Sequence, residues 1–153
     1  MTRLSRRALL ALPLFALALV AGPATSKPGA SNATPFPLSA VMDNPKLRAQ
    51  LPEGVSYYFA DQPAKVVKTL GPLHTNRRGS NVQGPQVACP WTMLGALISM
   101  GEAAKAQGGN AVVGIQSNIG GSAHASTQTF DCLLSNSRVL VNVALIGEAA
   151  VVE

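Results

Sequence analysis

The sequence predicts a mixed α/β (α+β) domain, a two-layer sandwich in which a mainly antiparallel sheet carries one long helix on one face. Three observations support this prediction. Only residues 90–107 combine the length and the apolar spacing of a long helix. About five shorter stretches have the composition of strands. Short segments rich in Gly, Pro, Asn and Ser connect them. The predicted order of elements is ββαβββ.

The first 26 residues are organised like a secretory signal peptide. Three arginines precede an uninterrupted apolar run over residues 8–21, and small residues follow it. This run is shorter than the roughly 20 residues that a membrane-spanning helix needs, so we expect cleavage, after Ser26 or alternatively after Ala24, instead of permanent anchoring. Export by the general route and by the twin-arginine route, which Arg6-Arg7 would serve, both stay open. The expected location is the periplasm or the medium, without stable membrane insertion.

The segment after the signal peptide, residues 27–37, is rich in Pro, Ser and Ala and reads as a flexible linker. The remaining residues, 38–153, are expected to form one domain. From residue 27 onward nine lysines and arginines oppose seven acidic residues, which is a net charge of +2. A protein that binds nucleic acid needs a concentrated basic face, so we do not expect a nucleic-acid partner.

A short helix is predicted ahead of the first strand. Residues 43–45, with the sequence Asp-Asn-Pro, offer an N-cap and a proline for the first helical position, and the helix covers 46–51. Residues 55–59 alternate in the manner of a short strand. Residues 65–75 are again extended and rich in β-branched side chains, with a bulge or kink at Gly71-Pro72. The two strands are expected to form a hairpin.

Residues 76–86 combine Arg, Gly, Ser, Asn and Pro and read as a mobile loop before the long helix. The helix begins near Pro90 and ends at the glycines after Gln107. Gly95 and Gly101 each cost a helix about 1 kcal/mol relative to Ala, which indicates that the helix backbone lies close to the sheet. The residues expected in its apolar core face are Trp91, Met93, Leu94, Leu97, Ile98, Met100 and Ala104.

The last part of the chain predicts three further strands, over 111–115, 127–133 and 139–146, with a Gly/Ser loop between the first two. Cys89 and Cys132 are the two cysteines. An even number in an exported chain favours a disulfide, worth roughly 4 kcal/mol for a loop of this length. A metal pair or a reactive thiol is the alternative, but either would need partners, such as a CxxC spacing, that the sequence lacks.

Two motifs stand close together in this region, Cys-Pro-Trp at residues 89–91 and Gly-Gly-Asn-Ala-Val-Val-Gly at residues 108–114. Together they resemble the YbjQ-like superfamily, in particular small exported bacterial proteins with one Cys near the helix start and another on a later strand. The resemblance covers about 60–149. It implies a ββαβββ fold similar to that of RcsF-like sensors of envelope stress.

Proteins of this kind often carry an excinuclease-like label, after the ATPase component of excinuclease ABC, which the residues do not support. An ATPase needs a phosphate-cradling loop of the Gly-x-x-x-x-Gly-Lys-Ser/Thr type, and that excinuclease component carries zinc-binding cysteine pairs. The sequence contains neither of these features. No Cys follows the apolar run either, so the lipid anchor of a tethered sensor is not expected.

Few residues are candidates for chemistry. His74 and His124 are weak candidates for metal ligands, because a transition-metal site needs three or four converging ligands and surface histidines are the simpler interpretation. Arg77 and Arg78 could bind an acidic partner or a lipid headgroup, although a solvated loop explains a basic pair as well. No Gly-x-Ser-x-Gly elbow is present and no cofactor is expected, so we do not predict an enzyme.

Two classes of function remain. The first is a disulfide-containing, non-enzymatic binding module of the cell envelope, whose partner is another envelope protein or its own copies. The alternative is a periplasmic protein that binds a metal or a small ligand. A stabilisation by ligand that depends on both histidines would distinguish the second class from the first.

Overall fold

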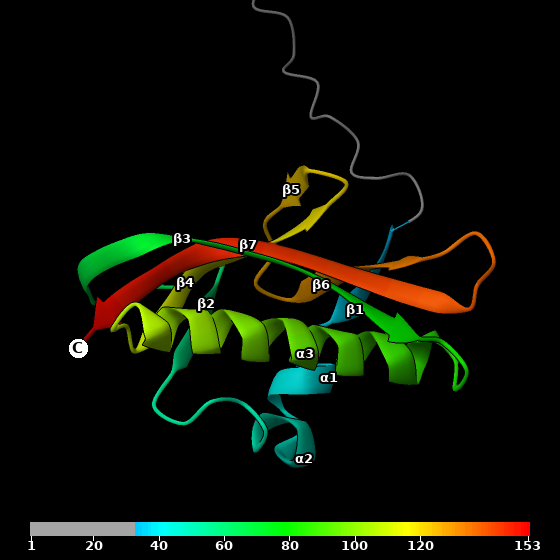
Figure 1. The fold of residues 1–153 in the computed structure, drawn as a ribbon, viewed down its shortest axis with the longest axis horizontal. Coiled ribbons are helices and arrows are strands. Elements are labelled where there is room, and N and C mark those ends of the chain that lie inside the picture. The colour runs from blue at the N-terminus through cyan, green and yellow to red at the C-terminus, as the bar shows by residue number, and fades with distance from the viewer. Residues whose placement is uncertain (1–32) are drawn as a thin grey trace, which may run out of the picture.

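The computed structural model describes residues 33–153, and the predicted signal peptide lies outside this part of the chain. The fold is mixed α+β and consists mostly of strands, which form a curled sheet (Figure 1). One long helix, α3 (Pro85–Ala106), runs beneath the sheet. Two short helices, α1 (Ser39–Met42) and α2 (Pro45–Arg48), follow one another on the other side of α3. No helix in the described part is long and apolar enough to cross a membrane.

The sheet is organised around its last strand. In chain order the strands are β1 (Ala33–Pro37), β2 (Ser56–Phe59), β3 (Val66–Ser80), β4 (Ala111–Ile119), β5 (Ser122–His124), β6 (Thr129–Leu134) and β7 (Leu140–Val152). Strand β3 pairs with one edge of β7 over its whole length, and β4 and β6 share the other edge. Strands β2 and β5 pair with β4, and β1 pairs with β6. All pairings are antiparallel except that of β2 with β4.

The first strand corrects the sequence prediction. The linker expected over 27–37 is wrong for residues 33–37, which form β1. Phe36 lies opposite Phe130 of β6, is only 4% exposed, and packs against that ring with 6.0 Å between the ring centroids. Prolines favour a linker because they cannot donate to a ladder, but β1 pairs only with β6 and an edge strand tolerates them.

The pairing of β2 and β3 also differs from the prediction. The expected hairpin is wrong, because β2 pairs in parallel with β4 while β3 pairs with β7. The loop expected over 76–86 is wrong for residues 76–80, which continue β3 as far as Ser80. The long β7 supplies partners for this stretch, and its ladder overrides the loop-like composition. The bulge predicted near Gly71-Pro72 is confirmed by a register shift between Thr69 and Gly71.

Helix α3 begins earlier than predicted. It starts at Pro85, whose ring suits the first turn, and Pro90 is buried within the helix instead of opening it. The predicted end is confirmed, since the helix ends at Ala106 and Gly108 takes a φ of 81°. Of the short helices, α2 has the predicted cap, because the Asn44 side chain accepts from the backbone N–H groups of the next turn.

The core face of α3 is confirmed for most of its expected residues and wrong for one. Met93 and Met100 are buried against the sheet, as are Leu94, Leu97 and Ala104. Trp91, however, is 51% exposed. It lies two residues from Met93, which is about 200° around a helix, so it points to the side away from the core. An apolar side chain in a helix with apolar residues on all sides does not reveal which side faces the sheet.

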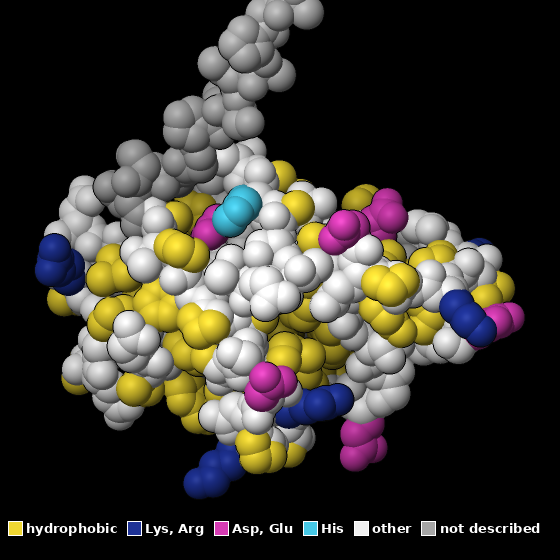
Figure 2. All heavy atoms as spheres, turned by 180° about the vertical axis from the view of Figure 1, so that it is seen from behind, with side chains coloured by type: hydrophobic (Ala, Val, Ile, Leu, Met, Phe, Trp, Pro, Cys, Tyr) yellow, Lys and Arg dark blue, Asp and Glu magenta, His cyan; other side chains and the backbone are white. Residues whose placement is uncertain are grey.

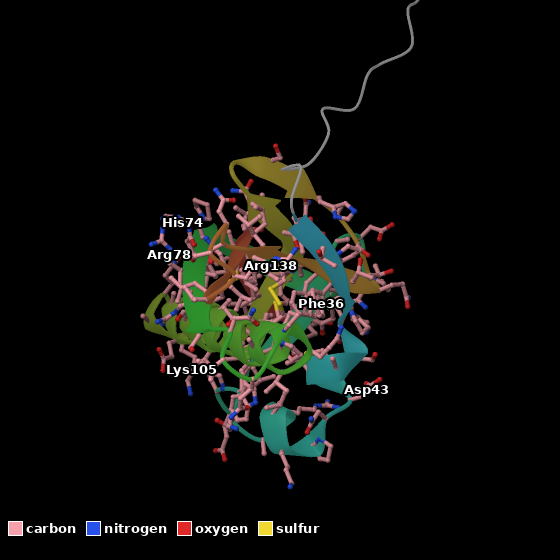
Figure 3. All side chains as sticks on the ribbon, turned by 90° about the vertical axis from the view of Figure 1, so that its right-hand side faces the viewer. Phe36, Asp43, His74, Arg78, Lys105 and Arg138 are labelled. Atoms are coloured by element: carbon pink, nitrogen blue, oxygen red, sulfur yellow. A yellow bond between two sulfur atoms is a disulfide. The ribbon has the colours of Figure 1, made fainter. Side chains whose placement is uncertain are left out.

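The predicted disulfide is present. Cys89, in the first part of α3, is bonded to Cys132 of β6, and the two Cα atoms are 6.0 Å apart. Both cysteines are fully buried. Figure 3 shows the bond in yellow between the helix and the strands. The bond therefore joins the helix to the part of the sheet that also holds β1.

The two glycines inside α3 behave differently. A Cβ at Gly101 would overlap the hydroxyl of Tyr57, so the close approach predicted for this helix is confirmed there. A Cβ at Gly95 would meet no atom within 4 Å, so Gly95 faces open space.

We expect Gly101→Ala to lower the free energy of unfolding by about 1–2 kcal/mol, because overpacking against Tyr57 exceeds the gain in helix propensity. We expect Gly95→Ala to raise it by up to about 1 kcal/mol, because only the propensity gain applies there. Urea unfolding of both variants measures the difference. Equal effects in the two variants would contradict the packing seen at Gly101.

Candidate binding groove between β3 and α3

The two histidines, weak candidates for metal ligands, are not brought together. His74 lies on β3 and His124 on β5, with β7 and β4 between them, so their backbones are about 14 Å apart. His124 instead contacts Asp131, with 3.0 Å between Nδ1 and Oδ2. In the described part of the chain, no three His, Cys, Asp or Glu side chains gather closely enough to hold a metal ion.

The two arginines predicted as interaction residues do belong to a common feature. Arg77 and Arg78 lie near the end of β3 and line a groove of about 450 Å³ between this strand and the first half of α3. Figure 3 shows Arg78 and His74 on the β3 side of the molecule, away from Phe36 and β1. The groove forms because a short connection returns the chain from β3 into α3, so strand and helix run side by side in opposite directions (Figure 1).

Exposed apolar side chains form much of the lining. Val82 in the connection is 90% exposed, and Val87 and Trp91 on α3 are 39% and 51% exposed. Gly95 continues the helix wall and leaves it open, because no atom lies within 4 Å of a Cβ built there. Three large apolar side chains in contact with water around one hollow are unusual on a small domain and mark an interaction surface.

The base of the groove is closed by tight packing between β3 and α3. A Cβ at Gly79 would overlap the hydroxyl of Thr92, which is buried and donates to the Ala88 carbonyl at 2.7 Å. Further along, the Arg77 guanidinium donates to the Ser99 hydroxyl. These contacts hold the strand and the helix wall in a fixed relation. They also place the Arg77 side chain on the helix face of the sheet.

The charge around the groove is of one sign. Its lining includes two arginines and no acidic side chain, and β3 as a whole contains Lys68, Arg77 and Arg78 but no Asp or Glu. On the opposite face of the molecule, basic and acidic side chains are scattered among polar and hydrophobic ones (Figure 2). The groove therefore presents a local positive potential beside its apolar wall.

The outer edge of β3 is free of strands. In residues 33–153, β3 pairs only with β7, so its other edge has no strand partner. Register shifts interrupt the first part of β3, but residues 71–80 pair with β7 in one continuous register. In an antiparallel ladder alternate residues direct their N–H and C=O groups to the outer edge. Part of this regular edge, residues 77–80, lines the groove.

Arg78 also lines a second hollow, of about 300 Å³, on the face of the sheet away from α3. Leu133, Leu140 and Asn142 contribute to the same hollow. Arg77 and Arg78 thus point to opposite faces at the same edge, as successive residues of a strand do. An extended chain alongside β3 would meet one cation on each of its own faces.

Apart from the groove, one side chain has a perturbed pKa. Burial raises the pKa of Tyr57 from 10.0 to about 12, and the nearby Glu102 carboxylate adds to this effect. The Tyr57 hydroxyl donates to the Leu97 carbonyl at 3.1 Å. This phenol connects β2 to α3 and is a structural contact.

The raised pKa predicts a loss of stability at alkaline pH. Below pH 10 the phenol is protonated in both the folded and the unfolded state, and its contribution is fully present. Between pH 10 and about 12 the unfolded state loses the proton first, so the contribution disappears over this range. We expect about 1 kcal/mol from this half-buried ring after allowing for solvent screening.

The measurement is urea unfolding at a series of pH values for the wild type, for Tyr57→Phe and for Tyr58→Phe as the matched control. The part of the alkaline loss that belongs to Tyr57 should vanish in Tyr57→Phe and persist in Tyr58→Phe. An unchanged pH profile in Tyr57→Phe would contradict the assignment.

Sequence reasoning found only the basic half of the groove. Val82 lies in a stretch that reads as a polar loop, and the apolar pattern of the helix places Trp91 in the core. The available signal was that a stretch of loop-like composition contains an isolated Val beside two arginines, directly before an aromatic residue in a helix. That pattern becomes a surface only when β3 and α3 are known to run side by side.

Comparison with models of known protein families and with curated proteins finds no match for this chain.

Proposed function

We propose that this chain is an exported, non-enzymatic interaction module of the cell envelope, and that it binds another envelope protein through the groove between β3 and α3. The observation that carries the proposal is the combination of exposed apolar side chains, two arginines and a free strand edge in one groove. Interfaces are enriched in aromatic residues and Arg, and Trp91 with Arg77 fits that composition.

Location and family belong to the same proposal. The buried disulfide supports an oxidising compartment, which agrees with the signal peptide expected over residues 1–26. We further propose that the fold is the two-layer sandwich of the YbjQ-like and RcsF-like proteins, and that the function relates to envelope stress. A sheet lying along one side of a single long helix supports this fold.

The chemistry of the groove supports binding over catalysis. Its ionisable groups are guanidiniums, which stay protonated and do not act as general bases. The hydroxyl of Thr92 is engaged with a backbone carbonyl. The remaining lining is apolar or backbone, which is suited to contact with a chain and not to bond cleavage.

Photo-cross-linking in intact cells tests the proposal. A photoreactive residue is placed at Val82 in the groove and, in a matched control, at the exposed Ala123 of β5 on the far side of the sheet. We expect one discrete adduct with another protein from position 82 and none from position 123. The same adduct should disappear when Gly95→Leu fills the groove.

Two results would overturn the proposal. One is the lack of an adduct at position 82, or an identical adduct from both positions. The other is a metal-dependent rise in melting temperature that is lost in His74→Ala and in His124→Ala, which would favour the metal-binding alternative.

A further inference from the structure

We propose that the groove binds an extended segment of a partner protein in which apolar and acidic residues alternate, and that this segment adds a strand to the free edge of β3. The inference rests on the proposed function and specifies the partner's chemistry. It depends on three observations, namely the backbone of β3, the helix wall beside it and the placement of the two arginines.

The backbone supplies the first argument. Residues 71–80 hold one register with β7, and no described strand occupies their other edge. Unpaired N–H and C=O groups on a regular edge are a template for a further strand. The first part of β3 is a poor template, because its register shifts and Pro72 lacks an N–H. The usable edge is therefore the stretch that ends at the groove.

The helix wall supplies the second argument. A strand added to this edge would run beside the Val87, Trp91 and Gly95 side of α3. Side chains on one face of that strand would lie against Val87 and Trp91, which are at present partly exposed to water. They would also enter the space that Gly95 leaves open. One face of the bound segment must accordingly be apolar.

The arginines supply the third argument. Arg78 lies at the same edge but on the face of the sheet away from α3, as the second hollow shows. The other face of an added strand would lie next to this guanidinium, and no acidic side chain of the groove competes for it. A carboxylate at every second position matches a guanidinium beside a strand edge. The ligand is thus an acidic peptide segment with alternating apolar residues.

A second copy of the chain fits the edge less well. If two β3 strands paired about a twofold axis near Leu73, Arg78 would lie opposite Lys68 of the other copy. With an axis near Arg77, the arginine pairs of the two copies would face each other. Like charges directly across a strand pair are destabilising. Charge therefore favours an acidic partner over self-association.

The test uses the single tryptophan of the chain, Trp91, as its reporter. A display library of random octapeptides is selected on the mature protein, and enriched sequences are synthesised. We expect enrichment of peptides with alternating apolar and acidic residues. Adding such a peptide should shift the Trp91 emission to shorter wavelength in a saturable manner. The same peptide methylated on alternate backbone nitrogens should bind at least about tenfold more weakly, because it cannot complete a ladder.

Three variants separate the contributions. Arg78→Glu should weaken binding by about tenfold or more, through loss of a cation and gain of a like charge. Gly95→Leu should abolish binding while the protein stays folded, because its side chain would fill the groove. Ala106→Leu, at an exposed position further along α3 and outside the groove, is the matched control and should bind as the wild type does.

Each alternative result overturns the inference. Failure to enrich any peptide does so, as does enrichment of basic or uncharged sequences, or binding that survives both Arg78→Glu and Gly95→Leu. A dimer that shields Trp91 in sedimentation and fluorescence experiments would replace the acidic segment with a second copy. If cross-linking from position 82 succeeds while the peptides fail, the proposed function stands and only the strand-addition mode is wrong.

Discussion

Removal of the disulfide between Cys89 and Cys132 is expected to lower the free energy of unfolding by about 4 kcal/mol. The bond closes a loop of 43 residues, and in the chain-entropy model such a loop restricts the unfolded chain by this amount. Since domains of this kind are stable by only about 5–15 kcal/mol, the loss is a large part of the total. The melting temperature should fall by roughly 10–20 °C.

The measurement is thermal and urea unfolding of the double variant Cys89→Ala, Cys132→Ala. Alanine is chosen because both positions are fully buried and a hydroxyl there would lack a partner. Adding reductant should destabilise the wild type to a similar extent and leave the double variant unchanged. A loss below about 1 kcal/mol would show that the packing of α3 on β6 does not need the bond.

Phe36→Ala is expected to have the second largest effect, a loss of about 3–5 kcal/mol. Phe36 is almost completely buried, and its ring packs on Phe130 of β6 at the centre of the β1–β6 pair. Truncation leaves a cavity in a place where β1 has few other apolar contacts, because the rest of that strand is mostly exposed. The variant should therefore release β1 as well as weaken the core.

Urea unfolding of Phe36→Ala measures the loss, with the exposed Thr34→Ala on the same strand as its control. The control should change the free energy of unfolding by less than about 0.5 kcal/mol. If both variants behave alike, β1 does not belong to the cooperative unit, and these residues act as the linker that their composition predicts.

The elements with a local signature were predictable from the sequence. The end of α3 follows from Gly108, which adopts the positive φ that stops a helix. The cap of α2 follows from Asn44 and Pro45, which act within one turn of backbone. The disulfide follows from an even cysteine count in a chain with an export signal, and its partners needed no spatial information.

The elements that depend on distant partners were not predictable. Residues 76–80 read as a loop because Gly79, Arg77 and Arg78 have low strand propensity, yet β7 holds them in a ladder. Residues 33–37 read as a linker until β6 is present to pair with them. For the candidate site the same limit applies, because Trp91 becomes a surface residue only when β3 approaches the other side of the helix.

By itself the sequence determined the mixed α+β class, the long helix and the cysteine pair, because periodicity, glycine and proline chemistry and cysteine count act locally along the chain. Only the tertiary structure decided that β2 pairs with β4, that β3 is a free edge, and that this edge lies beside Val87 and Trp91. The reason is that pairing partners and exposed faces depend on contacts between residues far apart in sequence. No local pattern in the chain records those contacts.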